Sequence, residues 1–116
     1  MADKPLVWIG SSRRDLLEFS DEARRRAGFE LRAVQRGDDP SDFKPMPLVG
    51  PGVYEIRIQT GDVFRLFYVT KFEEGVYVLH AFQKKTQKTP ARDIAIGQQR
   101  YKSAQEIHQQ GKRRRV

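Results

Sequence analysis

The chain has 116 residues, of which 38% are hydrophobic and 32% charged, which suits one modest hydrophobic core and favours a folded chain over a disordered one. A formal net charge of +7 favours phosphates or an acidic protein as partners. The absence of cysteine excludes disulfides and thiolate chemistry. The start MADKPLVWIG lacks the apolar core of a signal peptide and no run is long enough to span a membrane, so a cytoplasmic protein is expected.

The N-terminal third predicts one strand followed by a helical region. Pro5–Ile9 is a short apolar run typical of a strand. Ser12 and Asp15 have the spacing of a capping box, so a helix is expected to start there. Apolar residues then recur at steps of three and four, which predicts one helical stripe, either continuous or broken near Ser20 or Gly28. The stripe consists of Leu16, Phe19, Ala23, Ala27, Leu31 and Val34.

The middle of the chain predicts a long loop and then three strands. Gly37–Gly52 is rich in proline and glycine and is expected to be a loop that crosses from the helices to a sheet. Val53–Gln59 alternates between apolar and polar residues, and Val63–Thr70 and Val76–Phe82 are apolar runs of strand length. The short turns between them predict antiparallel hairpins.

The C-terminal part predicts one helix. Thr89 is a suitable N-cap and Pro90 a suitable first helical residue. One face of the helix would then carry Ile94, Gly97, Tyr101, Ala104 and Ile107. We expect a disordered basic tail at Gly111–Val116. The element order predicts a single small α+β domain over residues 1–110, with an antiparallel meander sheet packed against two N-terminal helices and a C-terminal helix.

Polar residues on the predicted meander indicate a site. Glu55 and Arg57 are two residues apart and therefore share one face of a strand. Arg65, on the next strand, is expected roughly opposite Arg57 or Gln59. An arginine in an apolar strand is costly unless it pairs or opens to a cleft. Two interpretations follow: a salt bridge between Arg65 and Glu55, or a cleft in which Arg57 and Arg65 hold a phosphate.

A lysine-rich loop leaves the last predicted strand at the edge of the same sheet. Lys84, Lys85 and Lys88 lie there, close to the start of a helix, where anions are favoured. Plain solvated lysines are the alternative. The convergence of these cations with the strand residues favours a polyanion such as RNA, and Lys88 and Arg92 are expected to bind it.

Such a set of residues is able to cleave RNA without a metal or a cofactor. A base removes the proton of the 2′-hydroxyl, which attacks the adjacent phosphate, and cations stabilise the phosphorane. Glu55 is the candidate base. The candidates for charge stabilisation are Arg57, Arg65, Lys84 and Lys85. Zinc, nucleotide-cofactor and serine-hydrolase motifs are absent.

Other candidate residues have a structural alternative. His80 has an ordinary pKa suited to a general acid, but a packed core histidine is the favoured interpretation. His108 is expected at the surface. Tyr68 and Phe82 are candidates for stacking an RNA base, with a place in the core as the alternative.

Three pieces of the sequence, Y-E-I-R, F-R-L-F-Y and F-x-K-K-T-x-K-T-P, resemble the RelE superfamily of bacterial toxins, specifically its phage-derived, HigB-like branch. The resemblance extends from Pro51 to Tyr101. It implies a compact α+β fold and the toxin of a type II toxin–antitoxin pair, an mRNA interferase that often acts on the ribosome. It also implies a small partner, commonly a helix-turn-helix antitoxin.

Position by position, the resemblance sets Glu55 and Arg57 against two basic strand residues of the family. Arg57 keeps the positive charge, whereas Glu55 places an acid where other members carry a lysine. Arg65 matches the arginine of the next strand. The basic residues after the last strand correspond to Lys84, Lys85 and Lys88. Two other functions stay open: a catalytically inactive module that binds nucleic acid, and a protein whose basic face binds only an acidic antitoxin-like partner.

Overall fold

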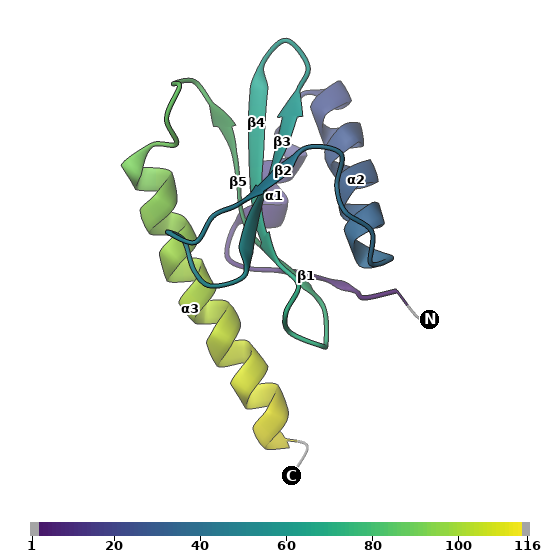
Figure 1. Ribbon diagram of the computed structural model, residues 1–116, viewed down its shortest axis with the longest axis vertical. Coiled ribbons are helices and arrows are strands. Elements are labelled where there is room, and N and C mark those ends of the chain that lie inside the picture. The colour runs from purple at the N-terminus through teal and green to yellow at the C-terminus, as the bar shows by residue number, and fades with distance from the viewer. Residues whose placement is uncertain (1–2, 115–116) are drawn as a thin grey trace.

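The computed structural model describes residues 3–114, which form one sheet with helices on both faces (Figure 1). It confirms the predicted α+β class, the meander and the helices on either side of it in sequence. The elements are β1 (Leu6–Trp8), α1 (Ser12–Leu17), α2 (Asp21–Gln35), β2 (Phe43–Pro45), β3 (Val53–Gln59), β4 (Val63–Val69), β5 (Val76–Lys84) and α3 (Ala91–Arg114).

The sheet has five strands in the order β1-β5-β4-β3-β2. The strands β3, β4 and β5 form the predicted antiparallel meander. β1 pairs with β5 in parallel, and β2 pairs with β3 as an antiparallel edge strand. β2 lies inside the segment that was expected to be a loop, so that prediction is wrong for Phe43–Pro45. Three residues that end in a proline give no recognisable periodicity, and the pairing with β3 makes them a strand.

The predicted helical stripe is broken at Ser20. Its side chain accepts a hydrogen bond from the backbone N–H of Ala23 and so caps α2, whereas Gly28 lies inside that helix. The capping box at the start of α1 does not form as expected. Ser11 is the N-cap, and its hydroxyl donates to Asp15, while the buried Ser12 donates to the carbonyl of Val78 in β5.

Two hydrophobic clusters cover the two faces of the sheet. The first joins the apolar stripe of α1 and α2, including Leu16 and Leu31, to residues such as Ile56 and Leu66. The second joins α3, through Tyr101 and Ala104, to the opposite face of the sheet. Gly97 lets α3 approach closely, because a Cβ there would lie 2.9 Å from a side-chain carbon of Phe67 in β4 and from one of Val49 in the β2–β3 loop.

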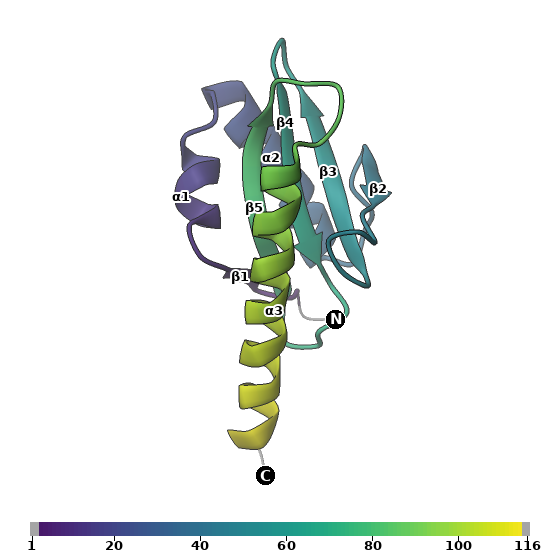
Figure 2. The ribbon, with the colours of Figure 1, turned by 90° about the vertical axis from the view of Figure 1, so that its left-hand side faces the viewer.

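The C-terminal half of α3 extends beyond the end of the sheet, as both ribbon views show (Figures 1 and 2). Ile107, predicted on the packed face, is therefore 44% exposed. The helix also continues through Gly111 to Arg114, where a disordered basic tail was expected. The last two residues of that expected tail lie outside the described part of the chain.

Candidate active site

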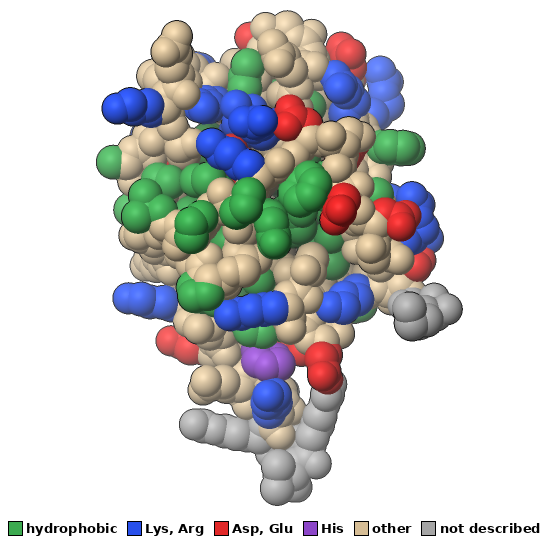
Figure 3. Space-filling model, in the orientation of Figure 1, with side chains coloured by type: hydrophobic (Ala, Val, Ile, Leu, Met, Phe, Trp, Pro, Cys, Tyr) green, Lys and Arg blue, Asp and Glu red, His purple; other side chains and the backbone are tan. Residues whose placement is uncertain are grey.

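Four cations from four strands share one face of the sheet with a buried glutamate. Strand pairing sets Lys44 of β2 opposite Glu55 of β3, and Arg57 of β3 opposite Arg65 of β4. Lys84, the last residue of β5, pairs with Val63 and so shares this face of the sheet. We call Lys44, Arg57, Arg65 and Lys84 the basic cluster. Lys and Arg side chains gather over the upper part of the face seen in Figure 3, above a band of hydrophobic side chains.

The carboxylate of Glu55 lies beneath these cations and is fully buried, with 0% of its side chain exposed. Its Oε1 lies 3.3 Å from Nε of Arg65 and 3.9 Å from Nζ of Lys44. Neither carboxylate oxygen has a hydrogen bond of good geometry from any residue in the described range 3–114. Buried carboxylates normally receive several hydrogen bonds, so this one keeps unused accepting capacity.

The two arginines face each other across β3 and β4, which places like charges directly opposite and is unfavourable. Asp42 offsets the positive charge of Arg57, since its Oδ1 lies 3.0 Å from Nε of Arg57. Its carbonyl also accepts a hydrogen bond from the backbone N–H of Arg57. Glu55 offsets the positive charge of Arg65. Arg65 is only 11% exposed, and burial lowers its pKa, an effect that Glu55 opposes and Arg57 reinforces.

Lys84 has an ammonium group that gives up its proton more readily than an ordinary lysine. Burial lowers its pKa most, and the charges of Arg65, Lys44 and Arg57 lower it further, against the opposing effect of Glu55. The cations that were predicted to follow it, Lys85, Lys88 and Arg92, are exposed in the β5–α3 loop and the first turn of α3.

The two aromatic candidates lie on opposite faces. Phe82 is directly opposite Arg65 on the face of the basic cluster, where it stacks on His80 with 4.8 Å between ring centroids. Tyr68 belongs to the cluster of buried residues beneath α1 and α2 and is only 3% exposed. The structure therefore brings Phe82, but not Tyr68, to the predicted site.

His80 is a packed core residue, as favoured above. Its Nε2 lies 2.7 Å from Oδ1 of the buried Asp93 in α3. Burial lowers its pKa despite the carboxylate, so the ring is neutral near pH 7. His108 is partly buried, with 17% of its side chain exposed, where a plain surface position was expected. Its Nδ1 lies 2.6 Å from Glu74, which also accepts a hydrogen bond from Tyr77, because α3 passes over the β4–β5 loop.

Two residues of the site, Asp42 and Lys44, were missed from the sequence. Both depend on β2, which turns Phe43 to one face and its neighbours to the other. The only sign of this strand in the sequence is the polar–apolar–polar order of Asp42, Phe43 and Lys44, which is too short to stand out in a proline-rich segment.

Within residues 3–114, no group of three histidine, aspartate or glutamate side chains is placed to hold a metal ion. Across the same part of the chain, no helix combines the length and the apolar character needed to cross a membrane.

Comparison with known proteins gives one family. The family model described as "Phage derived protein Gp49-like" matches residues 14–102, a range that contains the whole basic cluster together with Glu55 and Asp42. No curated protein matches the chain significantly. Because the family model covers most of the sequence, the chain belongs to the Gp49-like phage-derived proteins, a family associated with RelE-like toxins.

Proposed function

We propose that this protein is the toxin of a type II toxin–antitoxin pair, of the HigB-like branch, and that it is a metal-independent mRNA interferase. One observation carries the proposal: a buried carboxylate with unused accepting capacity lies beside Arg65 and Lys44, and Arg57 and Lys84 share its face of the sheet. Cations opposed across β3 and β4 cost stability, and a bound phosphate would relieve their repulsion. Membership of a family associated with RelE-like toxins supports the same function.

The basic cluster would bind the scissile phosphate. Arg57 is 37% exposed and Lys44 42% exposed, so both are accessible to a strand of RNA, while Arg65 lies deeper and is held by Glu55. Guanidinium groups on neighbouring strands present several N–H donors to phosphate oxygens. Lys85, Lys88 and Arg92 would hold the flanking phosphates, and Phe82 would contact a base.

Glu55 would act as the base after Lys44 has turned from it toward the phosphate, which the long 3.9 Å contact and the exposed side chain permit. The carboxylate then takes the proton of the 2′-hydroxyl. The 2′-oxygen forms a bond to phosphorus, the bond from phosphorus to the 5′-oxygen breaks, and the products are a 2′,3′-cyclic phosphate and a 5′-hydroxyl. Arg57 and Arg65 stabilise the phosphorane.

Lys84 is the proton donor we assign to the leaving 5′-oxygen. Its lowered pKa favours proton release, and its position on the face of the basic cluster sets it near the phosphate. His80 is a poorer donor because it is neutral and engaged with Asp93. On this basis the reaction takes place in the cytoplasm, on mRNA at the ribosome, and a helix-turn-helix antitoxin is the expected partner.

Induced expression in a bacterium tests the function. Wild-type protein should arrest growth and produce discrete cuts in an abundant message by primer extension. Arg65→Ala and the more exposed Arg57→Gln should abolish both effects. Arg24→Ala is the matched control, because Arg24 pairs with Asp21 on the surface of α2 and should leave both effects intact. Growth arrest that persists in soluble Arg65→Ala and Arg57→Gln proteins would refute the site.

A catalytically inactive module that binds nucleic acid is the second candidate, favoured by the full burial of Glu55 in the free chain. It predicts RNA binding that weakens steeply with salt while the message stays intact. Normal growth with soluble wild-type protein and salt-dependent binding would establish this function. Loss of RNA binding even at low salt would favour a basic face that serves only an acidic protein partner.

A further inference from the structure

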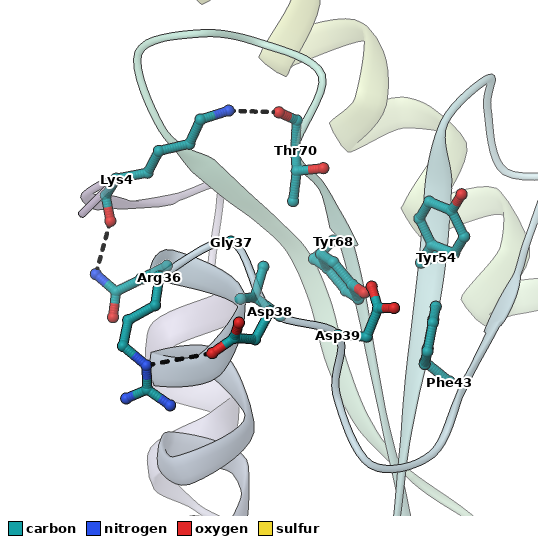
Figure 4. A pocket seen from close by; sticks show the side chains of 11 residues that line it. Lys4, Arg36, Gly37, Asp38, Asp39, Phe43, Tyr54, Tyr68 and Thr70 are labelled. Atoms are coloured by element: carbon teal, nitrogen blue, oxygen red, sulfur yellow. Dashed lines mark hydrogen bonds and ion pairs between the residues drawn. The ribbon is translucent and has the colours of Figure 1, made fainter. Parts of the chain in front are cut away.

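A cavity lies on the face of the sheet opposite the basic cluster. It has a volume of about 570 Å³ and lies between the C-terminal end of α2 and the strands β2, β3 and β4 (Figure 4). Strand alternation separates the two sites: Phe43 and Tyr54 face the cavity, whereas Lys44 and Glu55 face the basic cluster. A ligand in this cavity therefore leaves the candidate active site free.

The wall of the cavity is aromatic. The ring of Tyr54 lies between those of Phe43 and Tyr68, with centroid distances of 5.7 Å and 6.0 Å. Tyr68 is 97% buried, yet its hydroxyl has no hydrogen-bond partner within the described residues and faces the cavity (Figure 4). Burial raises the pKa of Tyr68, and Asp39 raises it further. The cavity thus offers aromatic faces and a neutral hydroxyl that is free to accept a hydrogen bond.

The charged side chains on the rim of the cavity differ in whether they already have a partner. Nζ of Lys4 donates to the carbonyls of Thr70, at 2.7 Å, and Phe72, so this cation is already engaged. Arg36 lies 3.5 Å from Asp38. Asp39 is exposed, lines the cavity and forms no ion pair with the side chains described, those of residues 3–112. The four charged side chains of the rim therefore sum to zero, but the two cations and Asp38 are already engaged, so Asp39 is the group left to pair with a ligand.

We propose that this cavity binds a guanidinium or primary ammonium group, presented as an arginine or lysine side chain by a partner polypeptide. The positive group would lie over the ring of Tyr54 and pair with Asp39, and its alkyl stem would pack on Phe43. A phosphate or a nucleotide is disfavoured, because Asp39 repels it and both rim cations have partners. The inference does not depend on the activity of the basic cluster.

Aromatic NMR spectroscopy of the full chain tests the proposal. The probes are the peptide acetyl-Gly-Arg-Gly-amide, the same peptide with neutral citrulline in place of arginine, and methylguanidinium. The arginine peptide should shift the ring resonances of Tyr54 and Tyr68 in a saturable manner, and the citrulline peptide should not. Stronger binding of the peptide than of methylguanidinium supports a polypeptide source, whereas equal binding supports the same site for a free small cation.

Three variants locate the binding. Asp39→Asn should weaken binding about tenfold or more, since it removes the paired charge, and Tyr68→Phe should weaken it while preserving the ring. Asp62→Asn is the charge-matched control, because Asp62 lies in the exposed β3–β4 turn and should leave the affinity unchanged. Equal binding of both peptides, no shift at the two tyrosines, or an equal loss in Asp39→Asn and Asp62→Asn would overturn the proposal.

Discussion

Replacing Glu55 with glutamine removes the negative charge beneath the basic cluster while nearly preserving the shape of the side chain. Arg65 then remains 11% exposed, with its main counter-charge gone and with Arg57 directly opposite. The exposed Lys44 loses only a long contact of 3.9 Å. The variant should therefore destabilise the fold through Arg65, because a buried cation without a partner is costly.

The size of the effect follows from the geometry. At 3.3 Å and an effective dielectric constant of about 20, Coulomb's law gives roughly 5 kcal/mol for the Glu55–Arg65 pair. The glutamine oxygen can still accept a hydrogen bond from Arg65, and the guanidinium retains some contact with water. We therefore expect the free energy of unfolding to fall by about 2–3 kcal/mol, near the lower end of the range of about 3–5 kcal/mol for breaking a buried pair.

Urea unfolding followed by the fluorescence of Trp8, the single tryptophan, measures this change. A double-mutant cycle with Arg65→Gln isolates the pair. The double variant should lose about 2 kcal/mol less than the sum of the single variants. Additive losses, or a change below about 0.5 kcal/mol in Glu55→Gln, would refute the account of Glu55 as the main compensating charge.

Three further predictions concern packing and pH. Gly97→Ala should lower the free energy of unfolding by about 1–3 kcal/mol, because the new Cβ would overlap buried side chains. Gly28→Ala has open space around it and should raise the free energy of unfolding by about 0.5–1 kcal/mol. Equal effects of the two variants in thermal unfolding would contradict the close approach of α3. The pKa of Glu74 is lowered, because hydrogen bonds from its neighbours outweigh the effect of burial. The carboxylate therefore stabilises the fold fully above its ordinary pKa of 4.5, and this contribution is lost as the pH falls through the lower pKa of the folded protein. Glu74→Gln should therefore differ from wild type most near neutral pH and least in acid, and a constant difference would exclude this linkage. Because burial lowers the pKa of His80, wild type should lose stability as the pH falls below 6.5, and His80→Gln should show a flatter profile in urea titrations between pH 7 and pH 5.

Local patterns were sufficient for most elements of the fold. The stripe from Leu16 to Val34 predicted the helices, and alternation from Val53 onward predicted the meander, because both signals extend over several turns or strands. The place of the helix break needed the structure. Ser20 and Gly28 were both plausible, and only the hydrogen bond that Ser20 accepts from Ala23 decides between them.

The candidate site was predicted in part for the same reason. Counting through one short turn predicted Arg65 opposite Arg57 or Gln59, and the register of the structure selects Arg57. Lys44 and Asp42 escaped prediction, since their strand forms only by pairing with β3. The burial of Glu55 also depends on neighbours that are distant in sequence. The strand pattern therefore predicted the face on which Glu55 lies but not whether its carboxylate is exposed to a substrate.

The sequence by itself determined the alternation of the strands, the apolar stripes of the helices and the excess of positive charge, since each depends on residues close in the chain or on composition alone. Tertiary structure decided which face of the sheet each polar side chain shares with others. In the folded chain Tyr68 lies away from the basic cluster, His108 is hydrogen-bonded to Glu74, and Glu55 is buried beside Arg65. Such contacts join residues that are far apart in sequence, and no local pattern of the chain specifies their distances or their burial.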